Sequence, residues 1–165
     1  MQVASVTIGV SVFILVLAFL IGIVAGLRAL TAPAAISWAA HLGLLPLQGT
    51  PLAWLGYAFT PYIFTVLALG ELFNDKLPKT PSRTIPPQFI TRIVTGALSG
   101  AAIGAARQSL ILGLIAGAIG AVAGTLGGSA IRAKLAGVFG KDLPAALLED
   151  AVAIILAIVV VTRLG

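Results

Sequence analysis

Two adjacent carboxylates stand inside an apolar stretch near the C-terminal end of the sequence. Glu149 and Asp150 lie in "DLPAALLEDAVAIILAIVVV", which is otherwise apolar enough to cross a membrane. If a helix excluded both acids, its apolar remainder, 151–162, would be about 18 Å long, well short of a bilayer core of about 30 Å. We therefore expect the two acids to lie within the membrane region, where ionisable groups mark proton or ion pathways, or the bilayer to thin around them.

A helical wheel places Asp150 on a face of small residues. Ala146, Ala153 and Ala157 share its side of the helix, and Glu149 flanks the same side. The opposite side carries a bulky stripe formed by Leu148, Val152, Ile155 and Val159. The pattern predicts that Asp150 faces other helices and that the bulky stripe faces lipid.

Further charged residues fall at the same predicted depth. Glu71, Asn74 and Asp75 are spaced i, i+3 and i+4, which places them on one ridge of a helix. We predict a proton or cation site, or a site for a small solute, formed by Glu71, Asn74, Asp75, Glu149 and Asp150, with Arg83 and Arg92 as counter-ions. Weaker candidates are Arg28, Thr31, Ser129 and Arg132, because Ser and Thr often bond their own helix and terminal arginines often reach the interface.

Several readings of these charges remain open from the sequence. The cluster is either a transport site or a set of ion pairs that only locks the helices, and acids solvated at the headgroups are a third reading. We expect no enzyme and no cofactor, because there is no Cys, only one His, and neither an HExxH nor a GxSxG pattern. The identity of any metal is open. Nucleic acid is not an expected partner, because the positive residues border apolar segments.

The composition is that of an integral membrane protein. Hydrophobic residues make up 59%, charged residues 9%, and the mean hydropathy is +1.14. Five stretches are long enough to span a bilayer: 6–27, 52–73, 88–107, 109–131 and 143–162. Residues 31–47 predict a short helix that lies at the interface or re-enters the membrane, with a sixth span as the alternative. The segment "NDKLPKTPSRTIPP" contains four prolines and predicts the main loop.

We therefore expect an all-α, polytopic helix bundle in one domain, 1–165. "GIVAGLRALTAPAA" resembles "GAVAGTLGGSAIRA", which suggests an inverted-topology repeat of halves 6–75 and 109–163 joined by the span 88–107. The bias toward Gly and Ala also produces such matches by chance.

The positive residues predict an orientation. A cytoplasmic N-terminus would place Lys76, Lys79, Arg83, Arg92, Arg132, Lys134 and Lys141 inside, and only Arg28, Arg107 and Arg163 outside. The positive-inside rule thus favours an N-terminus in the cytoplasm and a C-terminus outside.

Glycines recur at four-residue spacing in 96–128. This GxxxG spacing removes side-chain bulk from one helix face and predicts close packing, either within the chain or between protomers of a homodimer.

The sequence resembles a family of small bacterial integral membrane proteins classed as domain of unknown function 4126. The similarity is carried by "GLRALTAPAAISWAAHLG", "ELFNDKLPKTPSR", "GALSGAAIG" and "DLPAALLEDAVAI". Asp75, Lys76 and Pro78, then Pro81, Ser82 and Arg83, and the pair Glu149 and Asp150 are its most specific parts. The resemblance implies a multi-pass protein of the bacterial inner membrane, whose partner is the lipid bilayer, and it implies no activity.

Overall fold

The computed structural model describes residues 2–75 and 84–165, with side chains from Val12 onward. These residues form helices and no strand, which confirms the all-α class. The elements are α1 (Gln2–Leu27), α2 (Thr31–His41), a short 3-10 helix η1 (Ala53–Gly56), α3 (Thr60–Asn74), α4 (Pro86–Ala105), α5 (Leu110–Phe139) and α6 (Asp142–Thr162).

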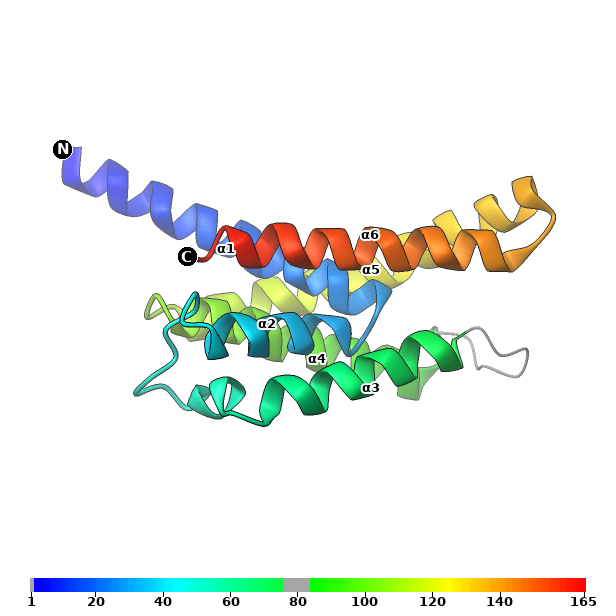
Figure 1. The fold of residues 1–165 in the computed structure, drawn as a ribbon. Coiled ribbons are helices and arrows are strands. Elements are labelled where there is room, and N and C mark those ends of the chain that lie inside the picture. The colour runs from blue at the N-terminus through cyan, green and yellow to red at the C-terminus, as the bar shows by residue number, and fades with distance from the viewer. Residues whose placement is uncertain (1, 76–83) are drawn as a thin grey trace.

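The helices run back and forth between two ends of an elongated bundle (Figure 1). α1 ends where α2 begins, α2 returns toward the other end, and α3 runs forward again. Both chain termini therefore lie at the same end of the bundle. The reason is that α2 runs back toward the other end of the bundle. The sequence favours a helix at the interface or re-entering the membrane for residues 31–47, with a further span as the alternative.

Some helix boundaries differ from the predicted spans. The spans 88–107 and 143–162 lie within two residues of α4 and α6, but 52–73 divides into η1 and α3. α3 begins at Thr60 with Pro61 in its first turn, a position where a proline's missing N–H removes no helical bond. α5 continues to Phe139, and Gly140 ends it with a left-handed backbone at φ 66°. The second proposed half therefore has no separate short helix, and the repeat stays a prediction.

α1, α4 and α5 pack through their glycines. A Cβ atom added at Gly113 of α5 would lie 2.8 Å from the Cα of Gly104 in α4. One added at Gly124 of α5 would lie 2.9 Å from the Cα of Ile23 in α1. Because any side chain here would meet backbone, the glycines let these three helices approach to backbone contact. α2 and α6 pack against this three-helix scaffold, and α3 packs against α2.

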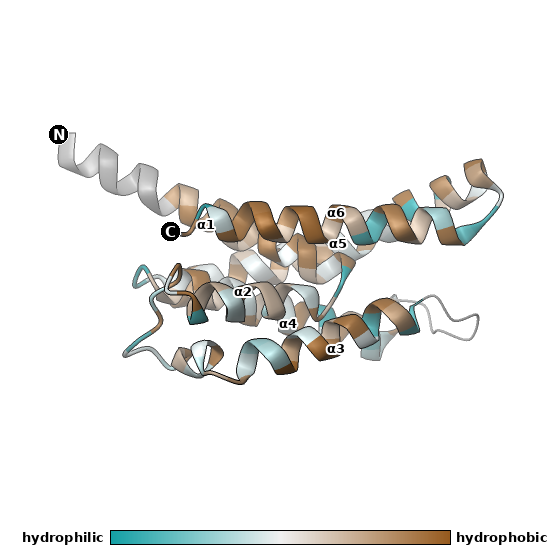
Figure 2. Ribbon diagram, viewed as in Figure 1, coloured by the Kyte–Doolittle hydropathy of each residue, from teal (hydrophilic) through white to brown (hydrophobic). Residues whose placement is uncertain are grey.

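Two helices, α5 and α6, are long and apolar enough to cross a membrane by length and composition. In their most apolar 18-residue stretches only 33% and 39% of the residues are buried within the protein. Figure 2 shows hydrophobic residues over most of α6, with hydrophilic ones toward its N-terminal part. The apolar surface of these helices therefore faces outward.

The predicted sides of the last helix are confirmed. Ala146, Asp150, Ala153 and Ala157 are buried. The bulky stripe is exposed, at 47%, 54%, 61% and 45% for Leu148, Val152, Ile155 and Val159. Asp150 thus faces the bundle interior.

Candidate functional site

Arg92 of α4 caps the end of α1. Its Nη1 donates hydrogen bonds to the carbonyl oxygens of Gly26 and Leu27, at 3.0 and 2.7 Å. The last carbonyls of a helix have no partner within the helix, so a buried donor satisfies groups that would otherwise be costly. Thr125 of α5 also donates to the Gly26 carbonyl, at 3.3 Å. The end of α1 is thereby fixed to α4 and α5.

Glu71 of α3 caps the start of α2. Its two carboxylate oxygens accept hydrogen bonds from the backbone N–H groups of Ala29 and Leu30, both at 2.8 Å. A carboxylate at a helix N-terminus is favourable because the unsatisfied N–H groups carry partial positive charge. Arg92 Nη2 lies 3.7 Å from Glu71 Oε1. Glu71 and Arg92 therefore hold the break between α1 and α2 from both sides.

Arg28 lies in this break and has no exposed side-chain area. Its Nε donates to Asp150 Oδ1 at 2.6 Å, and its Nη2 is 2.5 Å from the same oxygen. Its Nη1 is 2.7 Å from Asp75 Oδ2. A fully buried guanidinium requires such close partners, because removing an unpaired charge from water costs on the order of several kcal/mol. Arg28 thereby joins the α1–α2 break to α3 and α6.

Arg132 of α5 is the second centre of charge. It binds both oxygens of Asp142, at 2.9 Å from Nε and 2.6 Å from Nη2. Its Nη1 donates to Asp75 Oδ2 at 2.6 Å and to Glu149 Oε2 at 3.4 Å. The bidentate pair with Asp142 is the strongest geometry that an arginine and a carboxylate can adopt.

Asp75 links the two centres through a single oxygen. Its Oδ2 contacts both Arg28 and Arg132. Burial alone would raise the pKa of Asp75, but the hydrogen bond from Arg132 and the charge of Arg28 outweigh burial and lower this pKa below its ordinary value of 3.8. Asp75 is therefore ionised at neutral pH in this structure.

These contacts define one charge network. Its members are Arg28, Glu71, Asp75, Arg92, Arg132, Asp142, Glu149 and Asp150. It contains all five acidic residues of the sequence. The network joins α3, α4, α5, α6 and the α1–α2 break at one end of the bundle.

The structure brings together four of the five predicted site acids or amides. Glu71, Asp75, Glu149 and Asp150 all belong to the charge network, whereas Asn74 is an exposed residue at the end of α3. Arg83 lies outside the described residues.

The predicted counter-ions and weaker candidates are placed differently. Arg92 contacts Glu71 but is not paired with the acids of α6 in the contacts described above. Arg28 and Arg132 are central. Ser129 donates to the Leu126 carbonyl of its own helix at 2.8 Å, as expected. Thr31 opens α2 and lines a separate groove.

The sequence reasoning missed Asp142 and undervalued Arg28. Asp142 stands ten residues after Arg132, and only the turn between α5 and α6 brings them together. For Arg28 a signal was present: it is the single Lys or Arg in 1–75. An isolated arginine next to an apolar span needs an acidic partner, and the sequence offered few.

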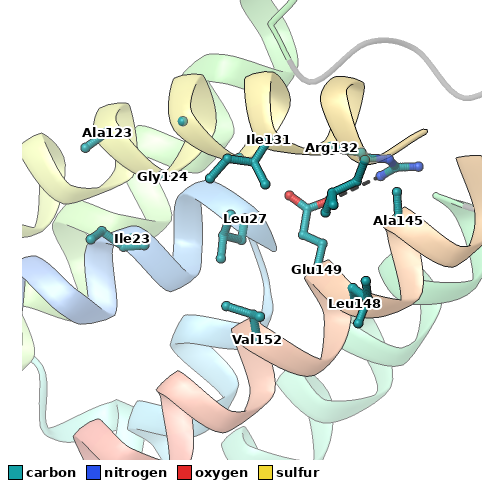
Figure 3. Close-up of a pocket in the computed structure, with 13 residues that line it drawn as sticks. Ile23, Leu27, Ala123, Gly124, Ile131, Arg132, Ala145, Leu148, Glu149 and Val152 are labelled. Carbon is teal, nitrogen blue, oxygen red and sulfur yellow. Dashed lines mark hydrogen bonds and ion pairs between the residues drawn. The ribbon is translucent and has the colours of Figure 1, made fainter. Parts of the chain in front are cut away.

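A groove between α1, α5 and α6 adjoins the network (Figure 3). Its volume is about 320 Å³. Its lining consists of Ile23, Leu27, Ala123, Gly124, Gly127, Gly128, Ile131, Arg132, Leu135, Ala145, Leu148, Glu149 and Val152. Arg132 and Glu149 are the charged residues of this lining, so the groove is apolar along its length and charged at one place.

The described residues contain no group of three or more His, Asp or Glu side chains placed to hold a metal ion. The network instead places each of its carboxylates near a guanidinium or near backbone N–H groups. Its available chemistry is the exchange of protons and of ion-pair partners.

Comparison with known families gives one match. The family described as a domain of unknown function, DUF4126, matches residues 15–163. The comparison with curated proteins found no significant match. The comparison with solved structures found none either.

Proposed function

Because the chain belongs to the DUF4126 family, whose description assigns no activity, we propose a function from its geometry. The chain is a multi-pass protein of a bacterial inner membrane that transports a proton, a cation or another small solute through the charge network. The observation that carries the proposal is the single oxygen of Asp75 shared by Arg28 and Arg132.

The outer surface supports residence in a bilayer. The core helix of a soluble protein is mostly buried, whereas most residues in the apolar stretches of α5 and α6 are not buried. α3 also exposes large apolar side chains, among them Val66 at 68% and Phe73 at 73%. Lipid is the proposed partner of this surface, and a second copy of the chain would cover part of it in a homodimer.

In this proposal α1, α4, α5 and α6 cross the membrane and α2 and α3 form a shorter pair within it. α2 has 11 residues and α3 has 15, which correspond to about 16 and 22 Å. Neither length reaches the roughly 30 Å of a hydrocarbon core. A shorter helix pair inside a bundle is tolerated where neighbouring helices shield its ends.

The distribution of positive residues supports a revised orientation. The network end of the bundle holds Arg28, Arg92, Arg132, Lys134 and Lys141, and the opposite end holds Arg107 and Arg163. Lys76, Lys79 and Arg83 lie outside the described residues and are not counted at either end. The positive-inside rule therefore places the network end in the cytoplasm and both termini outside, in place of the cytoplasmic N-terminus expected from five spans.

Cysteine labelling tests this orientation, because the chain has no Cys of its own. Gly165→Cys marks the end with the termini, and Gly137→Cys, at an exposed position near the end of α5, marks the network end. A membrane-impermeant maleimide should label Gly165→Cys in intact spheroplasts and Gly137→Cys only after permeabilisation. The reverse pattern would contradict the orientation.

The charge network is placed to hold the C-terminal end of α3 against the rest of the bundle. α3 packs beside α2, and few of its residues are buried. Glu71 and Asp75, at its C-terminal end, tie it to the α1–α2 break and to α5. Protonation of Asp75, or displacement of the arginines from its carboxylate by a solute cation, would weaken both arginine contacts and release α3 from the rest of the bundle. Such exchange of partners is how a two-state element opens and closes a pathway.

Flux measurements test transport. Protein in liposomes is expected to carry protons or cations along an imposed gradient, and Glu149→Gln and Asp150→Asn should abolish the flux while the protein still folds. Lys134→Gln is the matched control, since Lys134 is exposed on the same helix as Arg132. Undiminished flux in both acid variants would remove these acids from the mechanism.

A second candidate is a structural or partner-binding protein whose charges only lock the bundle. The observation that favours it is the close pairing of the carboxylates, including the bidentate contact of Arg132 with Asp142. In that case Glu149→Gln or Arg92→Gln should mainly lower thermal stability in detergent, and a charge swap should partly restore it. Flux from the wild-type chain would then be absent.

A further inference from the structure

The groove between α1, α5 and α6 has the form of a binding site for an amphiphile. Its walls are aliphatic side chains and small residues, such as Ile23, Leu27 and Val152, and its floor is opened by glycines of α5. Apolar side chains that border it are exposed, including Ile131 at 60% and Val152 at 54%. In a bilayer, the open side of such a groove meets hydrocarbon chains and not water.

The charged end of the groove is asymmetric. Figure 3 shows the carboxylate of Glu149 turned toward the space beside Leu27 and Ile131, with the guanidinium of Arg132 beyond it. Arg132 directs Nε and Nη2 to Asp142 and Nη1 to Asp75 as well as to Glu149. The group that a ligand in the groove reaches first is therefore a carboxylate.

Glu149 is also well placed to interact strongly. Its side chain is 7% exposed, so water screens a charge beside it only weakly. A charge-assisted hydrogen bond between an ammonium and a carboxylate in such surroundings is stronger than one between neutral groups. A hydroxyl or a second carboxylate in the same place would gain less or be repelled.

We propose that this groove binds an amphiphile with one alkyl chain and an amine head, with the chain between α1, α5 and α6 and the ammonium against Glu149. The proposal goes beyond transport, because it concerns occupancy of the groove and holds whether or not the chain moves a solute. It rests on the lining of the groove and on the position of Glu149.

The chain offers a matched pair of substitutions to test occupancy. A Cβ added at Gly127, which lines the groove, meets no atom within 4 Å, and the same holds for Gly137, which lies on the same helix outside the lining. Both glycines are exposed, so we expect either position to accept leucine. Gly127→Leu fills the groove, and Gly137→Leu changes the helix equally without filling it.

The measurement is native mass spectrometry of the full chain released from detergent micelles, with dodecylamine, dodecanol or dodecanoate added at equal concentration. We expect the wild type to bind dodecylamine about tenfold more tightly than dodecanol, and dodecanoate least, as one charge-assisted hydrogen bond predicts. Gly127→Leu should lose the binding of dodecylamine and Gly137→Leu should keep it. Glu149→Gln should bind dodecylamine and dodecanol alike.

Three results would overturn the proposal. Equal binding of the three probes by the wild type would show that no head group is recognised. Unchanged dodecylamine binding in Gly127→Leu would place the probe elsewhere on the surface. A Gly127→Leu variant that turns from dimer to monomer in the same spectra would show that a second copy of the chain occupies the groove. Because no flux is measured, these results stand apart from the outcome of the transport experiments.

Discussion

Replacing Arg28 with methionine should destabilise the bundle strongly. The substitution keeps an unbranched side chain of similar length but removes the contacts of 2.5–2.7 Å with Asp75 and Asp150. Removal of one partner from a buried ion pair costs about 3–5 kcal/mol, because the remaining charges stay desolvated. At about 2–4 °C per kcal/mol for a chain of this size, the melting temperature should fall by about 6–20 °C.

The assay is thermal unfolding in detergent micelles, followed by the fluorescence of Trp38 and Trp54. The double variant Arg28→Met/Asp150→Asn should recover part of the lost stability, because it removes a carboxylate together with its partner. Arg28→Lys should fall between wild type and Arg28→Met, since one ammonium cannot reproduce the fork of contacts. A methionine variant that melts with the wild type, or a double variant that loses the sum of two single losses, would refute the ion-pair reasoning.

Three further outcomes are expected. Gly117→Ala would place a Cβ 3.0 Å from the Gly100 Cα and should lower the free energy of unfolding by about 1–3 kcal/mol. Gly137→Ala is the control and should be neutral or slightly stabilising. Equal melting temperatures of the two variants would contradict the glycine packing. Glu71→Ala should cost about 1–3 kcal/mol by leaving two N–H groups unpaired, measurable by the same unfolding assay. Folding lowers the pKa of Asp75, so the stability that its ionised carboxylate gives the folded chain is complete above about pH 3.8 and is lost as the pH falls further. The melting temperature of the wild type should therefore fall in this acid range, and that of Asp75→Asn should fall less.

The helices could be predicted from the sequence because their signals are local. The apolar runs fix the element type and place the bounds of α4 and α6 within two residues. The start of α3 at Thr60 and the end of α5 at Phe139 differ from the predicted spans 52–73 and 109–131. The two sides of α6 follow from the spacing of its alanines and bulky residues, and the burial of Asp150 agrees with that spacing. These features depend on residues that are neighbours within one turn or two.

The pairing of charges and the path of α2 could not be predicted in the same way. Arg28 finds Asp150 across 122 positions of sequence, and this partnership depends on where α2 turns. A helix of eleven residues can lie at the membrane interface or run back through the bundle. Counting spans in the sequence therefore gives two different orientations for the chain termini. Asp142 is close to Arg132 only because α5 continues to Phe139 before turning.

The most direct test of the central claim, that the charge network is a transport site, is proton flux into liposomes that contain Asp75→Asn. Asp75 is the residue whose single oxygen joins Arg28 and Arg132. We predict flux in the wild type and in Lys134→Gln, and no flux in a folded Asp75→Asn variant. Equal flux in wild type and Asp75→Asn, or no flux from a folded wild-type chain, would contradict the claim.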